Sequence, residues 1–107
     1  MNDDWEAAEQ ALARSLELGR ESADVWASLA IVRVRRANPK GAMECLLEVI
    51  RLKPADAMAH CQMGQLLAKA GDRPGATKAF RQALRYQPDM REAREGLDKL
   101  RAGSPNP

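Results

Sequence analysis

Residues 26–54, WASLAIVRVRRANPKGAMECLLEVIRLKP, are followed by residues 60–88, HCQMGQLLAKAGDRPGATKAFRQALRYQP, and the two stretches share one pattern at a spacing of 34 residues. Most anchor positions hold small or apolar residues in both stretches. They are Leu29 with Met63, Ala42 with Ala76, Leu46 with Phe80, Ile50 with Leu84 and Pro54 with Pro88. Trp26, which aligns with His60, is the exception. A fixed period of roughly 20–50 residues is typical of proteins built from stacked repeats, so the sequence predicts a repeat fold.

The same shift toward the N-terminus reveals part of a third copy. The residues aligned with Ala42, Leu46, Ile50 and Leu52 are Ala8, Leu12, Leu16 and Leu18. We therefore expect one repeat domain over residues 1–102, followed by a flexible tail at 103–107. Within it we expect a half repeat at 4–22, full repeats at 23–56 and 57–90, and a capping helix at 90–101.

Residues that start and stop helices occur at matching places in the copies. Aromatic residues make up only 4% of a chain rich in Ala, Leu and Arg, and this composition favours helix over strand. Gly ends helices, Ser, Asn and Asp cap their N-termini, and Pro fits the first turn. The predicted stops are Gly19 and Gly71, and the predicted starts are Ser22 or Asp24, Asn38 with Pro39, Asp56, Asp72 and Asp89. The implied helices are roughly 4–18, 24–36, 39–52, 57–70, 73–86 and 90–101.

The pattern resembles that of the tetratricopeptide repeat (TPR) family, W-x2-L-G-x2-Y, then A-x3-F, then P. The first copy reads Trp26-x2-Leu29-Ala30-x2-Arg33, Ala42-x3-Leu46 and Pro54, and the second reads His60-x2-Met63-Gly64-x2-Leu67, Ala76-x3-Phe80 and Pro88. The resemblance covers about residues 4–101 and departs from the family at Arg33 and His60. It implies an all-α fold, an α-solenoid of antiparallel helix pairs wound as a right-handed superhelix.

The net charge of +2 is too small to indicate a nucleic-acid-binding protein. The charge is distributed unevenly, because residues 1–22 carry a net −4 and the remainder a net +6. The densest basic run, Arg33-Val34-Arg35-Arg36 with Lys40 beyond it, is interpreted as a helix C-terminus that favours cations. No apolar run is long enough to cross a membrane, and no signal peptide is evident, so we expect a cytoplasmic protein.

Candidate groups for catalysis or metal binding are few. Cys45 and Cys61 form no metal-binding or disulfide pattern and are interpreted as small helix residues in a reducing compartment. The one histidine, His60, adjoins Cys61 in sequence, and adjacent helix residues point about 100° apart, so the two form no nucleophile–base pair readily. His60 is expected to be half-buried in the place of a packing tryptophan. We therefore expect no enzyme activity, cofactor or metal.

The resemblance implies that the first helix of each pair lines a concave surface that binds a protein or peptide partner. The residues mapped to it are Asp24, Ala27, Ser28, Ile31, Val34 and Arg35 from one copy, and Met58, Cys61, Gln62, Gln65, Ala68 and Lys69 from the next. Ile31, Val34 and Met58, with Ala68, would form an exposed apolar strip. Members of the family that grip a C-terminal carboxylate use paired Lys and Asn side chains. The matching places here hold Ser28, Ile31, Gln62, Gln65 and Lys69, so this clamp is not expected.

The expected role is a scaffold or adaptor that binds a peptide in this groove. Two alternatives remain open, a self-assembly module and a regulatory fragment of a larger protein. The self-assembly alternative rests on the first helix, which would leave Trp5, Ala8 and Leu12 uncovered and could mediate a homo-oligomer.

Overall fold

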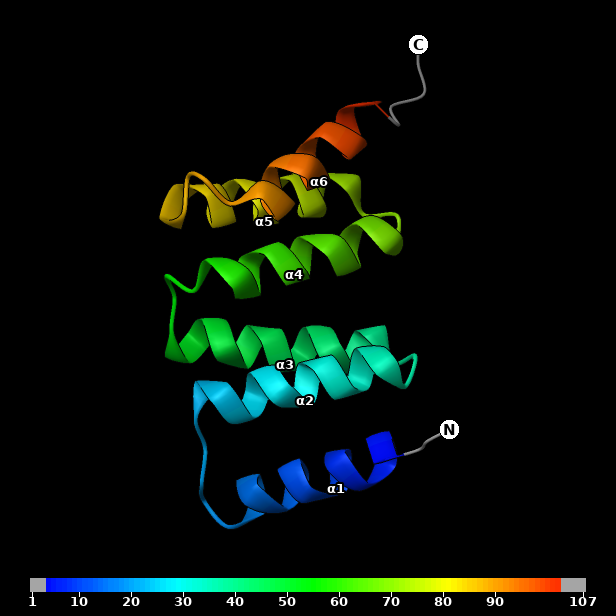
Figure 1. Ribbon diagram of the computed structural model, residues 1–107, viewed down its shortest axis with the longest axis vertical. Coiled ribbons are helices and arrows are strands. Elements are labelled where there is room, and N and C mark those ends of the chain that lie inside the picture. Colours follow the sequence, from blue (N-terminus) through cyan, green and yellow to red (C-terminus); the bar gives the residue numbers. More distant parts are fainter. Residues whose placement is uncertain (1–3, 103–107) are drawn as a thin grey trace. The chain divides into compact units, whose positions relative to one another are not determined.

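The computed structural model describes residues 4–102, and every regular element within this range is a helix (Figure 1). The helices are α1 (Asp4–Glu17), α2 (Ala23–Arg35), α3 (Pro39–Leu52), α4 (Ala57–Lys69), α5 (Arg73–Tyr86) and α6 (Arg91–Ala102). Each end lies within one residue of its predicted position. The flexible tail expected at 103–107 lies outside the described residues. The all-α class predicted from composition and spacing is confirmed.

Side-chain caps fix the starts of four helices. In each, a side-chain oxygen accepts a hydrogen bond from the backbone N–H three residues later, at 2.9–3.2 Å. The capping residues are Ser22, Asn38, Asp56 and Asp72. Ser22 rather than Asp24 therefore starts α2. The predicted cap of α6 is wrong, because this helix begins at Arg91 and the buried Met90, not Asp89, precedes it.

The chain divides into two compact units, residues 1–54 and 55–107. In the first unit α2 packs against α1 and α3, and α2 and α3 are joined by a three-residue turn (Figure 1). Leu29, Ala30, Ala42 and Leu46, all predicted core positions, are at most 2% exposed. The 34-residue period therefore identified the core of this unit.

The arginines of the basic run at the end of α2 contact α1 within the first unit. Glu9 of α1 accepts hydrogen bonds from Arg33 Nε at 3.3 Å and from Arg36 Nη1 at 2.8 Å. The Arg35 guanidinium lies 5.8 Å from the centre of the Trp5 ring, within cation–π range. Hydrogen bonds from Arg36 and then Arg33 lower the pKa of Glu9, although partial burial opposes them. The run is thus more than a favourable helix end, because its arginines contact α1.

In the second unit α5 packs against α4 and α6, and α6 also contacts α4. The Phe80 ring lies at the centre of this packing and is 2% exposed. It fits there because two helices approach it at glycines. A Cβ atom on Gly64 would lie 2.9 Å from the ring, and one on Gly96 would lie 2.4 Å from it. One aromatic side chain therefore fills the space between three helices.

Candidate functional site

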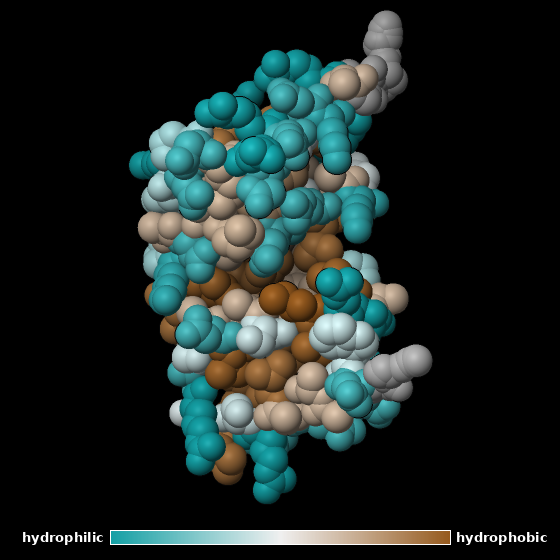
Figure 2. Space-filling view, viewed as in Figure 1, coloured by the Kyte–Doolittle hydropathy of each residue, from teal (hydrophilic) through white to brown (hydrophobic). Residues whose placement is uncertain are grey.

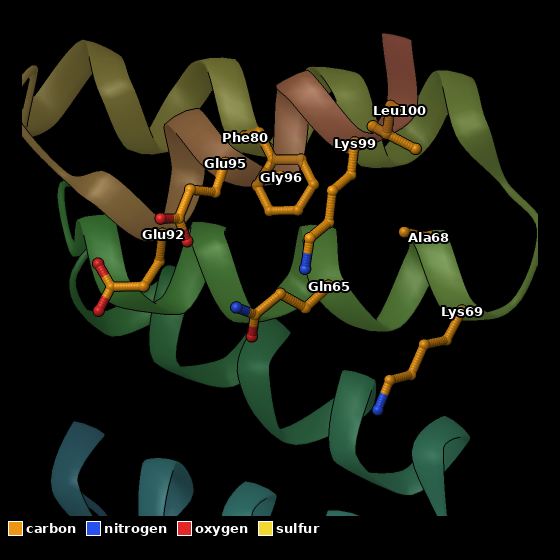
Figure 3. A pocket seen from close by; sticks show the side chains of 9 residues that line it. All are labelled: Gln65, Ala68, Lys69, Phe80, Glu92, Glu95, Gly96, Lys99 and Leu100. Atoms are coloured by element: carbon orange, nitrogen blue, oxygen red, sulfur yellow. The ribbon is translucent and has the colours of Figure 1, made fainter. Parts of the chain in front are cut away.

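A concave pocket of about 530 Å³ lies between α4 and α6 in the second unit (Figure 3). The lining residues come mainly from these two helices. They are Gln65, Ala68, Lys69, Phe80, Glu92, Glu95, Gly96, Lys99 and Leu100. The volume lies within the range of roughly 300–1,000 Å³ that is usual for ligand sites.

The apolar part of the pocket consists of Ala68, Leu100 and the edge of the Phe80 ring. Figure 3 shows the ring directly beside Gly96. Since Gly96 has no side chain, nothing on α6 screens the ring at this point. The ring is nevertheless almost fully buried, so the apolar surface it offers is small and suits a small side chain of a ligand.

The acidic and basic side chains of the pocket occupy different parts of it. Glu92 and Glu95 come from the first half of α6, whereas Lys99 lies near its end and Lys69 is the last residue of α4. Figure 3 shows the two carboxylates toward one end of the pocket and Lys69 at the other. Within residues 4–102, no ion pair joins any of these four side chains to an opposite charge. The four charges are therefore available to a ligand.

Cys61 was predicted to face the groove, and this prediction is wrong. Cys61 is fully buried in the cluster that contains Phe80, Ala76 and Met90. Burial raises the pKa of its thiol, and the nearby Glu92 carboxylate raises it further. A protonated thiol in a closed core neither contacts a partner nor acts as a nucleophile.

His60 is half-buried, as expected. Its ring stacks on Tyr86, with the ring centres 5.7 Å apart and the planes at 25°. The histidine therefore packs from α4 against the end of α5, in the place of the family tryptophan.

The other predicted groove residues divide between the two units. Gln65, Ala68 and Lys69 line the pocket, while Met58 on the same helix is exposed and Gln62 is half-buried. In the first unit Ala27 is half-buried, and the exposed residues of α2 are Asp24, Ser28, Ile31, Val34 and Arg35. Figure 2 shows hydrophobic surface over α2, and a mostly hydrophilic face over α5 and α6.

The face of α1 that was expected to be uncovered is partly exposed, and its role in assembly stays a prediction. No residue of α1 is buried, Trp5 is 44% exposed, and Ala8 and Leu12 are half-buried. Leu18, just after the helix, is 56% exposed. The ring of Trp5 also contacts Arg35, so one of its faces has a partner within the unit.

Sequence reasoning missed the α6 side of the pocket, because α6 was interpreted only as a cap. The missed residues are Glu92, Glu95, Gly96, Lys99 and Leu100. The signal that could have identified them is the period itself. A shift of 34 residues places Lys99 on Gln65 and Glu92 on Met58, both of which were predicted to line the groove.

A second, smaller hollow of about 250 Å³ lies between α5 and α6. It is lined by Arg73, Thr77, Arg81, Leu97, Leu100 and Arg101. Arg73 donates a hydrogen bond to the carbonyl of Leu100, near the C-terminal end of α6. This arginine therefore has a structural role at a helix end, where a cation is favourable.

Within the described range, no three metal-binding side chains come together, and no helix has the length and apolar character to cross a membrane.

Residues 57–90 match the family model described as tetratricopeptide repeat. The match spans α4, α5 and the turn that follows, the same residues as the second predicted copy. Residues 57–90 are therefore a tetratricopeptide repeat. Among curated proteins, none matches this chain in sequence.

Solved structures of TPR proteins share its fold. MamA superposes with a TM-score of 0.84 at 19% identity, over 89% of this chain and 56% of the MamA chain. The first TPR of Spaghetti (RPAP3) bound to the HSP90 peptide SRMEEVD has a TM-score of 0.85 at 15% identity, over 92% of this chain and 79% of that one. The second TPR domain of human RPAP3 in complex with the HSP70 peptide SGPTIEEVD has a TM-score of 0.82 at 20% identity, over 91% and 81%. These likenesses confirm an all-α helical-repeat fold, and this chain spans little more than half of MamA.

Proposed function

We propose that this TPR protein is a non-enzymatic interaction module that binds a peptide segment of another protein in the pocket between α4 and α6. The observation that carries the proposal is the pocket itself. It combines a small apolar floor with four charged side chains that have no ion-pair partner. Apolar surface supplies affinity, and a few convergent polar groups fix the orientation of a ligand.

Two similar structures support the choice of a peptide as ligand. Both RPAP3 domains hold short peptides, and this chain covers 79% and 81% of their length. The exposed side chains of α2, among them Ile31 and Val34, stay a separate predicted contact surface of the first unit.

A displayed library of random peptides tests the proposal. Peptides selected on the wild-type protein should bind at least tenfold more weakly to a Gln65→Ala/Lys99→Ala variant, because truncated contact residues commonly cost above roughly 1 kcal/mol each. A Lys78→Ala/Asp98→Ala variant is the matched control, since both residues are exposed and lie outside the pocket. Surface substitutions usually shift stability by no more than about 0.5 kcal/mol, so both variants should unfold like the wild type. Recovery of no binding peptide, or equal binding to both variants, would reject the proposal.

Self-assembly through α1 is the second candidate, and the exposure of Trp5 and Leu18 favours it. A hydrophobic contact between two copies should persist at 1 M salt, whereas a contact between acidic and basic surfaces should weaken as the Debye length falls to about 3 Å. Sedimentation at several salt and protein concentrations decides between them. A monomer under every condition rejects both forms of assembly.

A further inference from the structure

The charges in the pocket follow an order in Figure 3, with the two carboxylates toward one end, the Lys99 ammonium group near Gln65 in the middle and Lys69 at the other end. Glu92 and Lys99 are seven residues apart on α6, which corresponds to about 10 Å along the helix axis. Gln65 and Ala68, which carry no charge, lie on the facing helix α4. The pocket therefore has an electrostatic direction.

We propose that this pocket selects its peptide by the order of charge. The preferred segment has a basic side chain against Glu92 and Glu95, and a carboxylate against Lys99 and Lys69. A small apolar side chain lies between them on the Phe80 edge. This inference rests on the proposed function and names the class of ligand that the same pocket binds.

The helix positions also indicate the spacing within the peptide. An extended chain beside α6 would pass from Glu92 to Lys99 in about three residues, because it advances about 3.3–3.6 Å per residue and the two helix positions are about 10 Å apart along the axis. The residue between the two charges of the peptide cannot be large, because the floor there is only the edge of a buried ring flanked by Gly96. The preferred segment therefore has one basic and one acidic residue about three positions apart, with a small apolar residue between them.

The same charges disfavour peptides that are acidic throughout. The peptides SRMEEVD and SGPTIEEVD, held by the RPAP3 domains, end in two glutamates and an aspartate around a valine. Along this pocket, one or more of those carboxylates would lie against Glu92 or Glu95. Like charges placed together discriminate against a partner as effectively as attraction favours another. We therefore expect this protein to bind such acidic tails at least tenfold more weakly than a peptide with the proposed order of charge.

A charge swap tests the order directly. Glu95→Lys combined with Lys99→Glu keeps the net charge, the amino-acid composition of α6 and its (i, i+4) pair of opposite charges. A library of acetylated, amidated octapeptides should give one dominant order of charge on the wild type. The swap should lose this order, because it leaves Glu92 and Lys69 in place and makes the signs of charge alternate along the pocket. The matched control, Lys78→Glu with Asp98→Lys, exchanges two exposed charges outside the pocket and should select the wild-type order. A second library with free C-termini shows whether the carboxylate comes from a side chain or from the chain end.

The outcomes separate the two proposals. If peptides bind but show no order of charge, or the same order on the wild type and the swap, the order of charge is refuted while peptide binding stands. If no peptide is recovered from either library, both proposals fail. Circular dichroism establishes that the swap is folded, and Glu92→Lys with Lys69→Glu makes the charges alternate in the same way if it is not.

Discussion

Replacing Gly96 with alanine should destabilise the second unit, although alanine is the better helix former. The added Cβ would lie 2.4 Å from Cζ of Phe80, 2.6 Å from Cε1 and 2.7 Å from Cε2. Carbon atoms pack best at about 3.5–4.0 Å, so all three contacts are far too short. The ring has little space to retreat, because α4 also approaches it closely: a Cβ on Gly64 would lie 2.9 Å from Cδ1 and from Cε1 of the ring. Either α6 moves away from α5 or the ring leaves its rotamer.

The magnitude follows from two opposing terms. Overfilling a packed core costs typically about 1–3 kcal/mol. Alanine in place of glycine within a helix returns about 0.5–1 kcal/mol. The net loss expected for Gly96→Ala is therefore about 1–2 kcal/mol in the free energy of unfolding, measured by urea titration and far-UV circular dichroism.

A suppressor variant makes this reasoning refutable. Leucine occupies the position equivalent to Phe80 in the preceding copy, at Leu46, so Phe80→Leu is compatible with the repeat. Alone it should cost on the order of 1 kcal/mol through the space it leaves. Combined with Gly96→Ala, the new methyl group occupies part of that space, and the double variant should be more stable than the sum of the single effects by at least about 0.5 kcal/mol. Strict additivity, or a stabilising Gly96→Ala, would show that the ring does not restrict this position.

Two further predictions concern ionisable groups. Because hydrogen bonds from arginines lower the pKa of Glu9 in the folded protein, its stabilising effect is present above the unfolded value near about 4.3 and is lost as the pH falls through the folded value. Glu9→Gln should thus lower the free energy of unfolding at pH 7 by roughly 1 kcal/mol, and this difference should shrink as the pH falls below the unfolded pKa. A difference independent of pH in urea titrations would contradict this. Since burial raises the thiol pKa of Cys45 and of Cys61, both should resist a disulfide reagent at pH 8 until their own unit opens, and rapid native labelling followed by mass spectrometry would contradict this.

The parts of the fold that sequence predicted are those set by local chemistry. Asn38 and Asp72 cap their helices because a side-chain oxygen reaches a backbone N–H only three residues away. The period of 34 residues aligns Phe80 with Leu46, and both side chains are buried on the packed side of their helices. Neither prediction needs knowledge of distant residues. Capping and periodicity therefore gave the helices to within one residue.

The interactions that sequence could not place depend on long side chains and distant partners. Arg33 and Arg36 bind Glu9, which lies 24 and 27 residues away. Arg33 stands where the family has an aromatic residue, and its Nη1 also donates to the carbonyl of Gly41 at 3.1 Å. A guanidinium reaches several acceptors at once, and which of them it finds depends on how α1 and α3 pack on α2. The sequence showed a basic run but not its partners.

The charged residues of α6 fall into two sets, and this explains why its contribution to the pocket was missed. Asp98 aligns with Ala30 and Gly64, the small buried residues of the two preceding copies, yet it is exposed and charged. Burying an unpaired carboxylate there would cost several kcal/mol, so this face of α6 stays in water. Glu92, Glu95 and Lys99 are also charged, but the packing of α6 beside α4 places them in the pocket. Hydropathy alone cannot separate Asp98 from the charged residues of the pocket, because both belong to the hydrophilic side of the helix. Alignment with α4 separates them, since it matches Asp98 to a core position and Lys99 to a groove position.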